Sequence, residues 1–151
     1  MKVLSALVLV ICFGTGCASV QQASSEQEAA VKTFATVPDK GTLYIYRKPV
    51  VMWARGQTAP ITVDGVMIAA LRPGHFIVVH VVPGQHAITS ATMDTRRVQV
   101  EAGKNYFIRE RQTVTGAWIE IVHESEGKID VKNCQLLVNL GDEANLKPTG
   151  N

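Results

Sequence analysis

Cys17 is the residue of this chain whose surroundings most directly imply a chemical reaction. A positive start at Lys2 is followed by a nearly unbroken apolar run over residues 3–13 and by the small residues of the segment 14–16. This order is typical of a secretory signal, and the apolar run is too short for a membrane-spanning helix, which needs about 20 residues. Cys17 directly follows these small residues, at the point where such a signal is cleaved.

The segment around Cys17 resembles the lipobox of bacterial lipoproteins. The resemblance implies that Cys17 becomes the first mature residue and carries acyl chains on its sulfur and its amine, which together anchor far more firmly than one chain. Gly14 stands where that pattern most often has Leu. Ala18 follows the cysteine, and the sorting rule implied by the resemblance then predicts the outer membrane, with the domain facing the periplasm. Ordinary cleavage that releases a soluble protein is the alternative.

A second group of residues suggests binding rather than covalent chemistry. Met52, Trp53 and Arg55 lie between two expected strands, in a segment that the sequence predicts to be a loop. A tryptophan exposed on a loop of a rigid β scaffold often marks a binding surface, and arginine is common in such surfaces. These three residues are therefore candidates for gripping a glycan, a peptide or a partner protein. The alternative is that Trp53 folds over the open end of the domain as part of the core.

The remaining titratable side chains predict structural roles. The spacing of the histidines matches no metal-binding motif, and His86, after a Pro-Gly turn, is expected to support that turn through a hydrogen bond to the backbone. Glu110 and Glu120 are expected on outward faces of strands. No catalytic residues, no metal ligands and no cofactor are predicted, and the expectation is that the protein is not an enzyme. The four histidines are His75, His80, His86 and His123.

Charge and cysteine content restrict the possibilities further. The formal net charge is +2, and Arg96 and Arg97 form the only adjacent arginine pair, so no nucleic-acid-binding patch is predicted. Cys12 would leave with the leader, which makes Cys134 the single unmodified cysteine of the mature chain. A lone cysteine implies either a buried thiol or an intermolecular bridge, and the apolar neighbours of Cys134 favour the buried thiol.

The elements that must position these residues are predicted to be short strands. Asp64-Gly65 between two apolar runs is a strong hairpin signal, because both central residues of a type I′ turn need positive φ. Such frequent turns predict an all-β fold, a small antiparallel β-sandwich of about seven to eight strands. The expected strands are Thr42–Arg47, Pro60–Val63, Val66–Leu71, His75–Val82, His86–Thr92, Arg96–Glu101, Asn105–Gln112 and Ala117–His123.

The chain around these strands divides into four parts. Residues 1–16 form the leader, and the polar stretch 17–40 is expected to be a tether, with a possible helix cap at Ser25 and Glu28. Residues 41–140 form the β-sandwich domain, within which Lys128–Leu140 fits either a short helix or an edge strand. Residues 141–151 form a polar tail.

Several short motifs in a fixed order resemble the DUF2846 family of uncharacterised bacterial lipoproteins. Each motif alone is only a hairpin signature, but their order over residues 41–137 is more specific, and Pro-Gly-x-His also occurs in PEGA-type and transthyretin-like β-sandwiches. The resemblance implies architecture and localisation and supplies no catalytic residue. The motifs are Leu43–Arg47, Val63–Gly65, Leu71–Gly74, Val82–His86 and Glu101–Phe107.

Together these features predict a non-enzymatic outer-membrane lipoprotein, held through lipid on Cys17, whose β-sandwich binds an envelope protein, peptidoglycan or a glycan. Two alternatives stay open. The first is a hydrolase acting on cell-wall material, which a cleft with clustered carboxylates would favour. The second is a structural subunit of an envelope complex.

Overall fold

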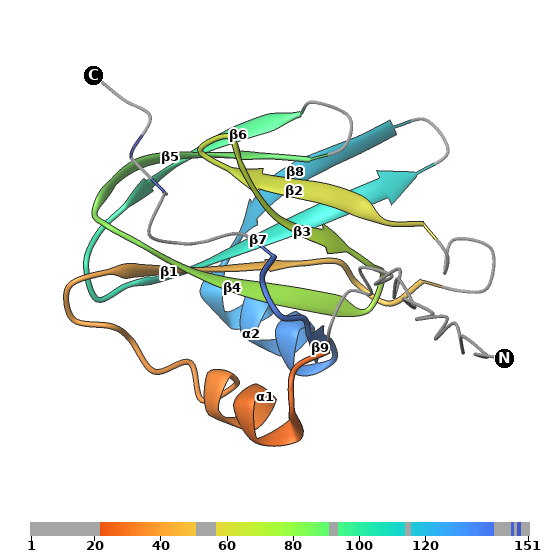
Figure 1. Cartoon of the computed structure of the whole chain (residues 1–151), viewed down its shortest axis with the longest axis horizontal. Coiled ribbons are helices and arrows are strands. Elements are labelled where there is room, and N and C mark those ends of the chain that lie inside the picture. The colour runs from red at the N-terminus through yellow and green to blue at the C-terminus, as the bar shows by residue number, and fades with distance from the viewer. Residues whose placement is uncertain are drawn as a thin grey trace, which may run out of the picture.

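The computed structural model describes residues 22–50, 57–90, 94–113 and 116–140, together with Leu146 and Pro148. Its strands form two sheets that pack face to face, which confirms the predicted all-β sandwich (Figure 1). The described residues hold one strand more than the eight that the sequence outlined, the two-residue β9. The elements are α1 (Ser25–Val31), β1 (Gly41–Tyr46), β2 (Ala59–Val63), β3 (Val66–Leu71), β4 (His75–Val81), β5 (Gly84–Thr89), β6 (Thr95–Val100), β7 (Asn105–Thr113), β8 (Gly116–Val122), α2 (Glu124–Lys132) and β9 (Gln135–Leu136).

The two sheets differ in their strand directions. The four-stranded sheet has the order β3-β2-β5-β6, and its described pairings are all antiparallel. The five-stranded sheet has the order β8-β7-β1-β4-β9 and is mixed, because β1 pairs parallel with β7 and β4 pairs parallel with β9. A parallel pair needs a long connection. Here the connection from β1 to β7 contains the whole second sheet, which a pattern of local hairpins does not predict.

Strand β1 is buried on both faces. The sequence alternates Leu43 and Ile45 with Tyr44 and Tyr46, and all four side chains are buried. The aliphatic pair packs into the core between the sheets, while the two tyrosines pack into a second core with Phe34 and other apolar residues. Helices α1 and α2 lie on that outer face of the five-stranded sheet (Figure 1). The tyrosines are therefore interior residues.

The segment from residue 22 to residue 34 packs on the domain. Helix α1 is capped by Ser24 with Gln27, one position before the predicted pair. Lys32 Nζ donates to the carbonyl oxygen of Cys134 at 2.7 Å, and Phe34 is buried against Tyr44 with ring centroids 5.3 Å apart. This part of the predicted tether, residues 17–40, therefore packs on the domain, because Phe34 and helix α1 complete the second core.

The last part of the domain contains both structures that the sequence left open. Helix α2 begins at Glu124, where the His123 side chain accepts from the Ser125 backbone N–H, and β9 follows it beside β4. Gly127 faces Phe107 so closely that a side chain there would collide with the ring. Cys134 is buried, as predicted, and burial raises the pKa of its thiol to about 12. No helix within the described residues is long and apolar enough to span a membrane.

Candidate functional site

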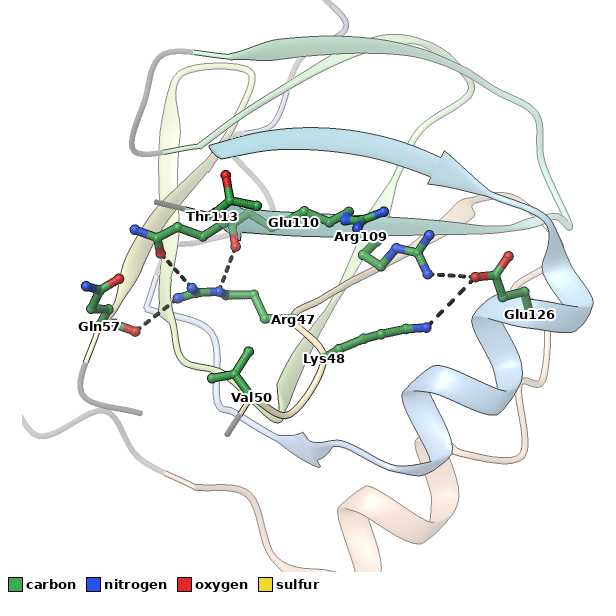
Figure 2. A pocket seen from close by; sticks show the side chains of 10 residues that line it. Arg47, Lys48, Val50, Gln57, Arg109, Glu110, Thr113 and Glu126 are labelled. Atoms are coloured by element: carbon green, nitrogen blue, oxygen red, sulfur yellow. Dashed lines mark hydrogen bonds and ion pairs between the residues drawn. The ribbon is translucent and has the colours of Figure 1, made fainter. Parts of the chain in front are cut away.

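A cavity of about 730 Å³ opens where strands β1 and β7 end (Figure 2). Strand β1 ends at Tyr46, which pairs with Arg109 of the parallel strand β7, so Arg47 and Lys48 come to lie beside the last residues of β7. Helix α2 contributes Glu126 to the opposite wall. The residues that line the cavity are Arg47, Lys48, Val50, Gln57, Arg109, Glu110, Arg111, Gln112, Thr113 and Glu126.

Arg47 is held in one position by partners on several sides. Its Nε lies 2.6 Å from Glu110 Oε2, and both side chains are almost completely buried. Nη1 donates to the carbonyl oxygen of Gln57 at 3.0 Å, and Nη2 donates to Gln112 Oε1 at 2.6 Å (Figure 2). Nη1 also donates to the carbonyl oxygen of Leu71 at 3.2 Å. Burial lowers the pKa of Arg47, although the charge of Glu110 opposes this effect. The guanidinium is thus a fixed charge in the wall of the cavity.

Glu110 is the least satisfied polar group of this wall. Burial raises the pKa of its carboxyl group, and the positive charge of Arg47 only partly opposes that shift. The contact of Oε2 with Arg47 is an ion pair without hydrogen-bond geometry, and Oε1 has no hydrogen-bond partner among the described residues. A buried oxygen without a donor costs free energy, because it has lost its water and gained nothing. This oxygen is therefore a buried acceptor without a donor in the wall of the cavity, and we call it the open acceptor.

A second polar network forms the wall nearest to α2. Arg109 Nη1 donates to Glu126 at 2.6 Å and to Asp130 at 3.1 Å, and Lys48 Nζ lies 2.9 Å from Asp130. The Tyr46 hydroxyl donates to the same Asp130 carboxylate at 2.8 Å. Burial acts to raise the pKa of Asp130, but the hydrogen bonds from Lys48 and Tyr46 and the nearby positive charges hold it below its ordinary value. Asp130 therefore stays ionised and fixes both cations.

Arg111 completes the charged lining at the rim. It lies 3.7 Å from Glu120, which also accepts from Arg109, and its guanidinium lies over the Trp118 ring, 5.3 Å from the centroid. The cations of the lining and the carboxylates paired with them are equal in number, so their formal charges cancel. The cations are Arg47, Lys48, Arg109 and Arg111, and the carboxylates are Glu110, Glu120, Glu126 and Asp130.

The predicted lipidation site and the predicted binding residues lie outside the described part of the chain. Cys17 and the binding candidates Met52, Trp53 and Arg55 belong to this group. Val50 lines the cavity three residues before Trp53 in the chain, and Gln57 lines it four residues after.

The outward position expected for Glu110 is wrong. The alternation of residues along β7 places Glu110 on the buried face of that strand. Along β7, Ile108 and Glu110 point to the same face, since residues two apart share a face of a strand. Ile108 packs in the core between the sheets, and Glu110 follows at its edge. Arg47 has the same relation to Leu43 and Ile45 in β1. Opposite charges at the ends of two apolar rows were therefore visible in the sequence, but their pairing was not.

Each histidine has a local structural contact. His75 Nδ1 donates to the carbonyl oxygen of Pro73 at 2.9 Å, and His80 Nδ1 lies 3.1 Å from Thr42 Oγ1. His86 is fully buried, with Nε2 donating to the Val82 carbonyl oxygen at 2.8 Å, which confirms its role in supporting the turn. His123 caps α2.

Comparison with known proteins agrees with the resemblance found in the sequence. Residues 38–124 match a family described as "Protein of unknown function (DUF2846)". A protein of Haemophilus influenzae, described as uncharacterized, is 31% identical over 134 residues, which cover 83% of this chain and 78% of that protein. No solved structure matches the chain.

Proposed function

The chain belongs to the DUF2846 family, and from this premise we propose that it is an outer-membrane lipoprotein whose β-sandwich binds another envelope component without catalysis. The cavity at the ends of β1 and β7 is the binding site of this proposal. The observation that carries it is the open acceptor of Glu110 beside a cavity of about 730 Å³. Ligand sites are typically cavities of about 300–1,000 Å³ with a few fixed polar groups.

The anchor of the proposal is the lipid on Cys17. Its support is the order of charged start, short apolar run and small residues before that cysteine. The described part of the segment after it, from residue 22, packs against β9, where Ala23 N–H donates to the Leu136 carbonyl oxygen at 3.1 Å. The domain would then lie close to the membrane surface rather than at the end of a long flexible tether.

A hydrolase acting on cell-wall material is the second candidate. It is favoured by Glu110, because a buried carboxyl group with a raised pKa is the kind of group that serves as a general acid. Against this role, Glu110 lies 2.6 Å from Arg47, and a nearby cation favours the ionised form over the protonated acid. A structural subunit of an envelope complex is the third candidate.

One experiment tests the binding site at the cavity and separates it from the structural-subunit candidate. Photo-crosslinking in intact cells from a photoreactive amino acid at Val50, which lines the cavity and is partly exposed, should capture a component of the envelope. The matched control carries the same group at Met67, an exposed residue of β3 that does not line the cavity. Equal yields at both positions would contradict a binding site at the cavity. Capture of one stoichiometric protein would favour the structural subunit.

The anchor is tested by the substitution Cys17→Ser. We expect this variant to lose its acyl chains and to move from the membrane to the soluble fraction of lysed cells, because the chains supply the membrane affinity. Cys134→Ser, which changes the buried thiol, is the control and should remain in the membrane fraction. Unchanged fractionation of Cys17→Ser would contradict the lipid anchor.

A further inference from the structure

The cavity presents charges of both signs to whatever enters it. Its inner wall holds the carboxylate of Glu110, with an oxygen that no described residue hydrogen-bonds. Its rim holds Lys48 and Arg111, whose side chains are 46% and 50% exposed. An inner acceptor and outer cations are complementary to a ligand that carries a donor at its inner end and an anion at its outer end.

Charge balance argues against a ligand with a large net charge. The cations and carboxylates of the lining and its partners cancel, so a polyanion would find no surplus of positive charge to neutralise. A group that carries both charges, with no net charge, matches the lining best. The ammonium and carboxylate of an amino acid or of a short peptide form such a group.

From this arrangement we infer that the cavity binds the charged ends of a free amino acid or short peptide, its ammonium on Glu110 and its carboxylate at the rim formed by Lys48 and Arg111. The inference deepens the proposed function and depends on it, because it gives the chemistry of the ligand at the same cavity. Glu110 can serve two partners at once, since a carboxylate has about four acceptor positions and Arg47 approaches only one oxygen closely.

The surroundings of Glu110 make this role specific. Arg47 cannot turn away to compete for the ligand, because its other nitrogens already donate to Gln57, Leu71 and Gln112. An ammonium that reached Oε1 would form a charge-assisted hydrogen bond with a carboxyl group that is buried from water, where such bonds are strong. It would also favour the ionised form of a carboxyl group whose pKa is otherwise raised by burial.

The test uses full-length protein in detergent micelles and isothermal titration calorimetry with four probes. These are alanyl-alanine, its N-acetyl derivative, its C-terminal amide, and a trimer of N-acetylglucosamine. We expect alanyl-alanine to bind, and both capped peptides to bind at least about tenfold more weakly, since each cap removes one charge. The dipeptide of D-alanine is measured in parallel. It should also bind, because the inferred contacts involve only the two charged ends of the ligand.

Variants then assign each charge to its wall. Glu110→Gln should bind the free and the N-acetylated dipeptide equally, because the partner of the ammonium is gone. Arg111→Ala and Lys48→Ala, at half-exposed positions where folding should be little affected, should each weaken the free dipeptide and leave the amide unchanged. Lys104→Ala is the matched control, since it removes an exposed lysine of the β6–β7 turn outside the cavity.

Each outcome decides the inference. Equal affinity for free and capped peptides, or no peptide binding up to about 10 mM, overturns it. Binding of the sugar trimer alone also overturns it and leaves the binding function in place. Peptide binding that survives Glu110→Gln, Arg111→Ala and Lys48→Ala with the same preference for free ends would place the ligand elsewhere. The crosslinking at Val50 reports on the cavity whatever the ligand, so failure of that experiment and failure of this one are distinguishable.

Discussion

Two buried contacts between a carboxylate and a basic side chain have the same length, but they differ in whether the remaining polar atoms have hydrogen-bond partners. His86 Nδ1 lies 2.6 Å from Asp64 Oδ2, and Arg47 Nε lies 2.6 Å from Glu110 Oε2. In the first pair the other carboxylate oxygen accepts from the Ala87 N–H at 2.9 Å, and the other ring nitrogen donates to Val82. In the second pair Glu110 Oε1 has no such partner among the described residues.

The difference separates a structural pair from a pair available for binding. The Asp64 carboxylate joins the β2–β3 turn to β5, because Asp64 sits in the turn at φ 51° and its partners His86 and Ala87 belong to β5. Nothing in that arrangement is left for a ligand. The Arg47–Glu110 pair lies at the end of the core between the sheets, beside the cavity, where an incomplete hydrogen-bond set can be completed from outside.

The largest effect is expected for His86→Ala. The variant leaves Asp64 as a buried carboxylate without its ring partner, leaves the Val82 carbonyl oxygen unpaired, and opens a hole at a fully buried position. We expect the free energy of unfolding to fall by about 3–4 kcal/mol, measured by urea denaturation. Peptide binding at a temperature where the variant is folded should be unchanged. A loss below 1 kcal/mol would show that the completed pair is not structural.

Glu110→Gln should be less damaging. The amide has nearly the same shape, and Arg47 keeps its bonds to Gln57, Leu71 and Gln112, so we expect a loss of about 1–2 kcal/mol by the same method. The double change Arg47→Met with Glu110→Leu should lose more than Glu110→Gln, because Gln57, Leu71 and Gln112 then lose their donor. If the double variant is as stable as Glu110→Gln or more stable, these bonds of Arg47 add nothing to stability.

The pH dependence of stability should have opposite signs for Glu110 and Asp130, because their pKa values are shifted in opposite directions. The pKa of Glu110 is raised in the folded state, so over the range between its ordinary and its raised value the folded chain binds more protons than the unfolded chain. Stability from this group is therefore present at low pH and is lost as pH rises. Asp130 has a lowered pKa and acts in the opposite direction, losing its contribution as pH falls.

Urea denaturation between about pH 4 and pH 8, compared between the wild type and Glu110→Gln, isolates the Glu110 contribution. The difference in the free energy of unfolding between the two proteins should shift in favour of Glu110→Gln as pH rises. A difference that is constant across the range would mean that the pKa of Glu110 is the same in the folded and unfolded chain.

The smallest effect on stability is expected for Trp53→Ala. If Trp53 belongs to the binding surface, capture of the partner by crosslinking should weaken, while the free energy of unfolding should change by no more than about 0.5 kcal/mol. Met67→Ala, at an exposed residue of β3 that does not line the cavity, is the control. A stability loss of about 3 kcal/mol or more would show instead that Trp53 is part of the core, as cavity-forming substitutions of large aromatic residues are.

Much of the fold followed from local patterns. The Asp64-Gly65 turn, whose residues have φ of 51° and 80°, and the eight longer strands were predicted because turn chemistry and alternation act over a few residues. The parallel pairing of β1 with β7 was not predicted, since it joins segments about sixty residues apart. The elements that cover Tyr44 and Tyr46 were not predicted for a related reason: the two helices come from opposite ends of the described chain.

The sequence by itself determined the alternation of strands and turns and the family to which the chain belongs. Only the tertiary structure decided that Arg47 and Glu110 meet, because neither residue carries a local signal of the other. Hydrophobic alternation reports which face of a strand a residue occupies, and it does not report which strand lies beside it. The cavity exists because the parallel pairing of β1 and β7 brings the charged residues at the ends of both strands to one edge of the sandwich.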